Sequence, residues 1–323
     1  MRMLLSYGVS LLRERGSSLS TMNTVPLAYL DGRFLPLSEA SLPLHDAGFV
    51  MGATVTDFCR TFNRVLYCWP NHLSRFRRDC AACFVPLSQT DAELTGIAEE
   101  LVRHNAGLFG PGQELALITF ATPGPIGYYL GEPGGAGDGP PTLGMHTFQL
   151  PFERYRRFFR EGVSLAVTDS STSVFARNKH RSRLPWWAAE RRLRENGRPP
   201  GTLALGQSSK GELAETAIGH FLLVQAGTVV TPRRKYVLDG VSLRVVVELC
   251  NNLNIPFADT DIHRNEVRTA DEAMLCGTAF CLAGVSRIDD WRIPWPGPVF
   301  TRLLAAWSER VGLDIARQFL PNP

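Results

Sequence analysis

Hydrophobic and polar positions follow two different periods in the first half of the chain. Apolar runs flank Asp31-Gly32, and this dipeptide between two such runs indicates a β-hairpin. In residues 73–84, apolar side chains recur at helical spacing with arginines between them, which is typical of an amphipathic helix. The elements predicted in this half are a hairpin over 27–36, helices at 73–84 and 91–105, strands at 114–121 and 145–150, and a strand or helix start at 55–62.

In the second half, short apolar runs alternate with longer helical patterns. Asn196-Gly197 ends one helical pattern, and Ala226-Gly227 separates two apolar runs as a tight turn. Residues 131–141 are rich in glycine and proline and predict a surface loop, while the polar and aromatic stretch 151–160 predicts a connector. The elements predicted here are strands at 162–168, 202–205, 221–225, 228–231 and 272–276, and helices at 184–195, 241–253 and 299–311.

The mixture of helices and strands, without an internal repeat, indicates an α+β protein. A length of 323 residues corresponds to about two domains at ~100–200 residues each. The predicted division is a loose extension over 1–24, a smaller N-terminal domain over 25–152 and a larger C-terminal domain over 153–323.

Composition narrows the classes of partner. The 34 basic and 31 acidic residues leave a formal charge of +3, too balanced for an electrostatic nucleic-acid binder. The longest uncharged stretches are broken by proline, glycine or histidine and fall short of the ~20 apolar residues that a membrane helix needs. The seven cysteines are an odd number without paired metal-site spacing, which favours free thiols in a reducing compartment and so a cytoplasmic protein.

Only three lysines are present, Lys179, Lys210 and Lys235, so chemistry that requires a primary amine has three candidates. Lys179 stands just before a predicted helix, and Glu215 lies between apolar strands; taken singly, each would be an ordinary solvated charge. Residues 238–242 begin a helix, whose free N–H groups form a ready anion site, and 276–279 form a second turn of small residues.

Seven short motifs, in order along the chain, together carry a family resemblance. They are D-x-G-F-x-x-G at 46–52, H-x-x-R at 72–75, K-x-x-x-R-L at 179–184, G-x-x-x-E at 211–215, T-P at 231–232, L-x-G-x-S at 238–242 and A-D-E followed by G-T at 270–278. This series resembles the class IV, fold-type IV, pyridoxal-phosphate enzymes, which include branched-chain and D-amino-acid aminotransferases and aminodeoxychorismate lyase. The resemblance spans residues 29–313.

The resemblance implies a fold, a cofactor and a set of roles. The fold would be a small N-terminal α/β domain and a larger C-terminal domain with a barrel-like sheet, and the cofactor would be pyridoxal 5'-phosphate. Lys179 would form the Schiff base and shuttle protons, and Glu215 would pair with the pyridine nitrogen. The remaining contacts would come from Leu238 on the ring and, around the phosphate, from Arg75, Gly240, Val241, Ser242, Gly277 and Thr278. No metal is implied.

Several positions depart from the family pattern where relatives bind substrate. Thr56 replaces an aromatic residue, Phe58 replaces a small one, and His220 stands where the family has asparagine. Phe120 occupies a position at which a carboxylate-binding arginine could stand, and an aromatic ring cannot neutralise a carboxylate. We therefore expect small dicarboxylates to be poor donors, and an apolar or aromatic donor, or an amine without a carboxylate, to be preferred.

Three interpretations of the activity remain open at this stage. The first is an aminotransferase that moves an amino group between an amino acid or amine and a 2-oxo acid. The second is a β-eliminating lyase of the aminodeoxychorismate type with the same cofactor. The third is a catalytically silent relative, against which the intact set of Lys179, Glu215, Arg75 and Thr278 argues. The family also implies a homodimer.

Overall fold

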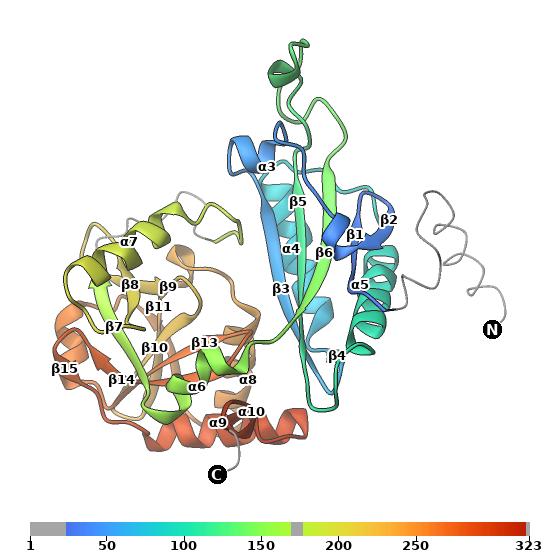
Figure 1. Cartoon of the computed structure of the whole chain (residues 1–323). Coiled ribbons are helices and arrows are strands. Elements are labelled where there is room, and N and C mark those ends of the chain that lie inside the picture. The colour runs from blue at the N-terminus through green and yellow to red at the C-terminus, as the bar shows by residue number, and fades with distance from the viewer. Residues whose placement is uncertain (1–23, 169–176, 321–323) are drawn as a thin grey trace. The chain divides into compact units, whose positions relative to one another are not determined.

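A computed structural model describes residues 24–168 and 177–320 (Figure 1). Residues 1–23, almost the whole of the predicted extension, lie outside the described part of the chain. The chain divides into two compact units, one of residues 1–150 with Lys179–Ser182, the other of Pro151–Asn178 with Arg183–Pro323. The sequence-based division assigns Lys179 to the C-terminal part, whereas its contacts group it with the first unit. Among the described helices, none is long and apolar enough to cross a membrane.

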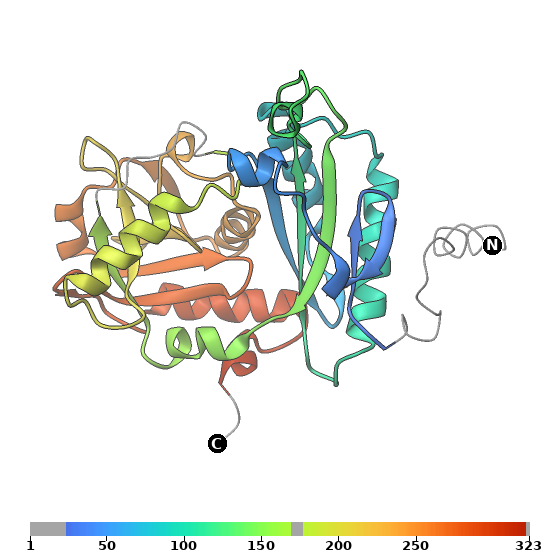
Figure 2. The ribbon, with the colours of Figure 1, turned by 45° about the horizontal axis from the view of Figure 1, so that its top comes forward.

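The first unit is a six-stranded antiparallel sheet with the two long helices α4 and α5 on one face (Figures 1 and 2). Its strand order is β2-β1-β6-β5-β3-β4. The strands are β1 (Leu27–Leu30), β2 (Arg33–Pro36), β3 (Val55–Phe62), β4 (Val65–Leu66), β5 (Leu115–Thr122) and β6 (Thr142–Gln149), and the helices are α3 (Ala47–Val50), α4 (Trp69–Ala82) and α5 (Asp91–Ala106), with 3₁₀ turns at Leu37–Glu39 and Gly127–Leu130.

Side chains alternate between the two faces of the sheet along each strand, and the apolar ones show which face α4 and α5 cover. Odd-numbered residues such as Val55 and Leu117 pack with Leu73 and Phe76 of α4 in one buried cluster. Even-numbered residues of β3, β5 and β6 therefore point to the opposite face of the sheet. The ambiguous segment 55–62 is a strand, and the predicted hairpin is confirmed by the pairing of Leu30 with Arg33 across Asp31-Gly32.

A buried carboxylate fixes the turn that precedes β3. Asp46 is fully buried and caps α3 by accepting a hydrogen bond from the Gly48 amide at 2.7 Å. Its other oxygen accepts hydrogen bonds from the Thr122 and Thr142 hydroxyls at 3.0 and 2.8 Å. Asp46 thus ties the short α3 helix to β5 and β6.

The second unit contains a closed ring of six strands, the barrel-like sheet that the family resemblance implies. The ring runs β10-β13-β14-β7-β8-β9 and closes through the pairing of Glu215 with His220. The ring strands are β7 (Val163–Thr168), β8 (Leu203–Gln207), β9 (Leu213–Thr216), β10 (His220–Gln225), β13 (Glu272–Gly277) and β14 (Cys281–Ile288). The remaining strands are β11 (Thr228–Pro232), β12 (Phe257–Thr260) and β15 (Trp291–Arg292), with 3₁₀ turns at Arg234–Tyr236 and Arg264–Thr269.

The helices of the second unit are α6 (Phe152–Arg160), α7 (Leu184–Glu195), α8 (Val241–Asn252), α9 (Pro298–Val311) and α10 (Ile315–Phe319). The prediction of a connector over 151–160 is wrong, because these residues form α6. Tyr155 and Phe158 of this helix are buried against Phe280, with ring centroids 5.5 and 5.6 Å away. The four arginines of this segment concealed the helical spacing of its aromatic residues. Strands β9, β12 and β14 were also not predicted.

Removing the Asp46 carboxylate should destabilise the first unit. Asp46→Ala leaves the buried Thr122 and Thr142 hydroxyls without their acceptor, so we expect a loss of about 3 kcal/mol, from the value of hydrogen bonds to a charged group. Urea unfolding followed by circular dichroism measures the loss, with the exposed Glu39→Ala as control. Equal midpoints for the two variants would show that Asp46 does not hold the turn.

Candidate active site

The segment around Lys179 is an added strand on the open edge of β3. Val55 pairs with His180 in an antiparallel bridge. The Thr56 amide donates to the Lys179 carbonyl and the Arg181 amide donates to the Thr54 carbonyl, both at 2.9 Å. The Lys179 amide donates to Asp79 Oδ2 at 2.8 Å. The backbone of Lys179 is therefore fixed on both sides by the first unit.

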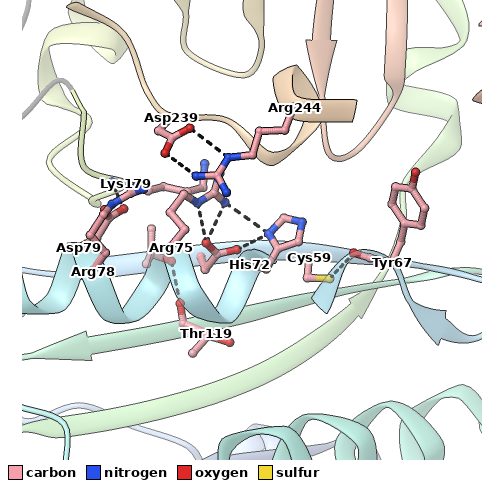
Figure 3. Close-up of polar contacts among 12 residues, drawn as sticks. Cys59, Tyr67, His72, Arg75, Arg78, Asp79, Thr119, Lys179, Asp239 and Arg244 are labelled. Carbon is pink, nitrogen blue, oxygen red and sulfur yellow. Dashed lines mark hydrogen bonds and ion pairs between the residues drawn. The ribbon is translucent and has the colours of Figure 1, made fainter. Parts of the chain in front are cut away.

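A buried charge cluster lies between β3 and α4 (Figure 3). Asp57 Oδ2 accepts hydrogen bonds from Arg75 Nε and Nη2 at 2.9 and 2.7 Å, and Asp57 Oδ1 lies 2.6 Å from His72 Nδ1. Burial alone would raise the pKa of Asp57, but the Arg75 guanidinium, assisted by His72 and Lys179, holds that pKa well below its usual range. Burial lowers the pKa of His72, so Asp57 and Arg75 form the charged pair.

The three first-unit residues predicted to line the substrate pocket share the sheet face opposite α4 and α5. Thr56 pairs with Phe120 and Phe58 pairs with Ile118 across β3 and β5. Phe120 in turn pairs with Gly144 of β6, and a Cβ on Gly144 would lie 2.2 Å from Phe120 Cζ. The outer edge of the Phe120 ring thus lies against Gly144 of β6, where only glycine leaves room for it.

In the second unit, Glu215 and His220 form the pair that closes the barrel. The half-buried Glu215 accepts a hydrogen bond from the Leu238 amide at 3.4 Å, which links β9 to the segment that leads into α8. His220 also pairs with Cys276 of β13. Cross-strand partners share a face, so Glu215, His220 and Cys276 form one row across three strands.

His220 is buried and makes one side-chain hydrogen bond. Its Nε2 lies 2.6 Å from Thr231 Oγ1, and that hydroxyl lies 3.2 Å from the Pro232 carbonyl. A carbonyl can only accept, so the arrangement that satisfies both contacts has Nε2–H donating to Thr231. Nδ1 is then a buried acceptor with no partner among the described residues. Burial, assisted by Arg234, lowers the pKa of His220 to about 3.

Two backbone features of the second unit suit an anion. Gly240 precedes α8 without a side-chain cap, so the N–H groups of Val241 and Ser242 begin the helix with no capping side chain. Gly277 ends β13, where a Cβ would lie 2.8 Å from the Ile218 carbonyl oxygen, so the turn into Thr278 requires a glycine. These features fit the phosphate of the cofactor that the resemblance implies.

The structure thus gathers the predicted site residues into two groups, one in each unit. The first unit holds Arg75, Lys179, Thr56, Phe58 and Phe120, and the second holds Glu215, His220, Leu238, Gly240, Val241, Ser242, Gly277 and Thr278. The sequence did not predict that Asp57 holds Arg75 or that Asp79 accepts a hydrogen bond from the Lys179 amide. Asp79 could have been found, since it lies one helical turn beyond Arg75, and Asp57 was visible as an acid within an apolar strand.

The family model described as "Amino-transferase class IV" matches residues 54–288 of the chain. This match covers more than half of the chain and includes every residue of both groups. The chain belongs to the class IV aminotransferase family.

Individual class IV aminotransferase relatives extend the comparison. A D-alanine aminotransferase of Bacillus licheniformis is 23% identical over 290 residues, which cover 89% of this chain and 98% of that protein. The branched-chain amino acid aminotransferase of Escherichia coli has a similar fold, with a TM-score of 0.79, 18% identity and coverage of 88% of this chain and 94% of that one.

A third class IV neighbour is a lyase. The 4-amino-4-deoxychorismate lyase from Pseudomonas aeruginosa matches with a TM-score of 0.72 and 24% identity, over 89% of this chain and the whole of that one. At these identities the structural likenesses show the fold, and the two-domain fold-type IV architecture is confirmed.

The buried neutral His220 should give this class IV aminotransferase a distinct pH dependence of stability. Its pKa is about 3 in the folded state and about 6.5 in the unfolded state. Between these values the unfolded state binds more protons, so the free energy of unfolding should rise with pH, by at most about 1.4 kcal/mol per pH unit. His220→Asn should flatten the rise between pH 4 and 6 in urea titrations. Identical slopes in the two proteins would contradict it.

Proposed function

We propose that this protein is a pyridoxal-phosphate-dependent aminotransferase that moves an amino group between an amino acid or amine and a 2-oxo acid. One observation carries the proposal. Lys179 is the half-buried member of the three lysines, with both its amide and its carbonyl hydrogen-bonded, while Lys210 and Lys235 are exposed. Its positive charge also contributes to the lowered pKa of Asp57, which supports an amine that acts beside the Asp57–Arg75 pair.

The two groups of residues supply what such a cofactor needs. We assign the phosphate to Arg75, the N–H groups of Val241 and Ser242, the Ser242 hydroxyl and Gly277-Thr278, with Gly240 giving access to the start of α8. We assign the ring nitrogen to Glu215 and a ring face to Leu238. When bound, the cofactor supplies an aldehyde for the amine and a ring that accepts electrons from the substrate carbon.

The chain's own residues then hold charge and protons at defined atoms. The Lys179 amine would hold the cofactor covalently, and it would carry a proton to and from the substrate carbon. The Glu215 carboxylate keeps a proton on the ring nitrogen, because an anion favours the protonated form of its neighbour. Asp57 holds the Arg75 guanidinium in one orientation through two N–H donors.

A β-eliminating lyase is the second candidate. It is favoured by the K-H-x-x-R-L motif at 179–184 and by the structural likeness to the 4-amino-4-deoxychorismate lyase. Mixing the holoenzyme with an amino acid that carries a leaving group on its β carbon, in the absence of a 2-oxo acid, separates the two. An aminotransferase converts its cofactor to the pyridoxamine form and stops, whereas a lyase returns the cofactor unchanged and accumulates pyruvate.

We further propose that the protein is a cytoplasmic homodimer. All seven cysteines are free thiols, as a reducing compartment would keep them. Exposed apolar side chains cluster on two segments of the first unit, residues 42–51 and 125–130. The Asp46–Pro125 bridge joins these segments. These side chains are Leu42, Leu44, Phe49, Met51, Tyr128, Tyr129 and Leu130. The two segments carry no lysine, arginine or glutamate, so a second copy could meet this surface without repulsion between like charges.

Lys179→Ala should abolish covalent attachment of the cofactor and all turnover, because the two other lysines are exposed and remote in sequence from the site motifs. Borohydride reduction of the holoenzyme followed by peptide mapping should find the pyridoxyl group on Lys179, with Lys210→Ala as the control that retains labelling. A label on Lys210 or Lys235 would overturn the assignment.

Glu215→Gln should lower the chemical step by about 10²-fold or more, as expected for the loss of one preorganised charge. Binding of the cofactor should weaken less, because the phosphate contacts remain. Single-turnover absorbance measures the rate and fluorescence titration measures the affinity. An unchanged rate would remove Glu215 from the mechanism.

Phe49→Asp should dissociate the homodimer, because it places a charge in the proposed apolar contact. Light scattering of the purified protein should give twice the chain mass for the wild type and the chain mass for the variant. Val65→Asp, at another exposed apolar residue outside the two segments, is the matched control and should stay dimeric. A monomeric wild type would contradict the proposal.

A further inference from the structure

Arg181 emerges on the sheet face that carries Thr56, Phe58 and Phe120. The bridge between Val55 and His180 sets the register of the added strand, and the Arg181 amide donates to the Thr54 carbonyl. Since His180 is opposite Val55 on the helix-covered face, its neighbour Arg181 begins on the other face.

The electrostatics of His146 indicate where the guanidinium goes. His146 lies on β6, paired with Ile118 of β5, and so belongs to the same face as Phe58 and Phe120. Burial lowers the pKa of His146, and the positive charge of Arg181 lowers it further. The positive charge of Arg181 therefore acts on a residue of the face that carries Phe58 and Phe120.

No carboxylate pairs with this charge among the described residues. The Asp46 carboxylate reaches the same face, but it accepts hydrogen bonds from the Gly48 amide and from the Thr122 and Thr142 hydroxyls. The even-numbered residues of β3, β5 and β6 that form the face include no aspartate or glutamate. Over residues 24–168 and 177–320, no ion pair or side-chain hydrogen bond to Arg181 is found, whereas Arg75, Arg77, Arg78 and Arg103 of the same unit each pair with a carboxylate. Partial burial lowers the pKa of Arg181 and no carboxylate raises it, while the residue remains exposed, so the guanidinium is uncompensated and accessible to a ligand.

Aromatic side chains of β3, β5 and β6 cover the middle of the face. Phe58 lies 6.0 Å from Phe148 between ring centroids, and the Phe120 ring lies against Gly144. Arg60, the other cation on the face, is buried with its guanidinium 3.9 Å from the centre of the Phe62 ring. One cation beside an apolar surface matches a ligand with one carboxylate and one apolar group.

We propose that Arg181 binds the carboxylate of the amino donor and of the 2-oxo acid, while Phe58 and Phe120 contact the apolar side chain. The inference rests on the aminotransferase activity proposed above and names its substrate class, monocarboxylic amino acids with apolar or aromatic side chains. A guanidinium can meet both oxygens of a carboxylate with parallel N–H donors, which lysine cannot do. Arg181 thus supplies the positive charge for the carboxylate, which the aromatic ring of Phe120 cannot neutralise.

The test compares a donor that has a carboxylate with its decarboxylated counterpart. For Arg181→Gln, kcat/KM with phenylalanine should fall about 10- to 100-fold, the range for one lost charge-assisted contact, while kcat/KM with 2-phenylethylamine changes less than about 2-fold. Arg181→Lys should lie between wild type and Arg181→Gln. Arg33→Gln, an exposed arginine on β2, is the matched control and should leave both donors unchanged.

A binding measurement separates this role from a structural one and from failure of the proposed activity. Calorimetry with 3-phenylpropanoate on the protein without cofactor should show binding that Arg181→Gln weakens about 10-fold or more and that Arg33→Gln retains. The affinity for pyridoxal phosphate should be equal in all variants.

Three results would overturn the role of Arg181. They are equal losses with both donors, unchanged kinetics in Arg181→Gln, and 3-phenylpropanoate binding that is insensitive to the substitution. A wild type that is never converted to the pyridoxamine form would instead refute the aminotransferase proposal, and the calorimetry would still test Arg181.

Discussion

The buried carboxylate of Asp57 is the constraint on which the first unit's half of the site depends. A charge with 2% of its surface exposed requires a partner, and Arg75 supplies it with two N–H donors. This pair fixes the rotation of α4 against β3, so Asp79, one turn further on, meets the Lys179 amide. The position of Lys179, the half-buried lysine, therefore depends on the Asp57–Arg75 ion pair. Asp57 lies two residues after Val55, which pairs with the segment that carries Lys179.

Much of the fold could be predicted from local pattern. Helices α5 and α7 lie within one residue of the predicted ranges, because their apolar spacing is regular and turn or capping residues mark their ends. The range of β3 was also predicted, but its type was left open between a strand and a helix start. Strand β9 was missed because only four residues separate two turns, and its strand character comes from pairing with β8 and β10. Helix α6 was missed because its aromatic residues find their partners, Phe280 and Phe319, more than 100 residues later. Long-range pairing of this kind leaves no local signal.

The candidate site also has residues that local sequence predicts and residues that depend on long-range contacts. Lys179, Glu215 and Arg75 could be found because they stand in recognisable motifs, but their partners are set by three-dimensional contacts. The motif at 46–52 supported the family resemblance without assigning a role to its residues, and the structure shows that Asp46 anchors α3 through two threonines from β5 and β6. Arg181 could not be singled out among the arginines that follow Lys179, since only the register with β3 assigns it to a sheet face.

The close approach of Phe120 to Gly144 makes the shape of the open sheet face a property of two positions rather than one. A methyl group at position 144 would displace the ring as effectively as a change at position 120 itself. A smaller residue at position 120 would in turn free position 144 from its need for glycine. The two positions should therefore covary during evolution, and a change of preferred substrate that acts through one of them will require a second substitution on the neighbouring strand.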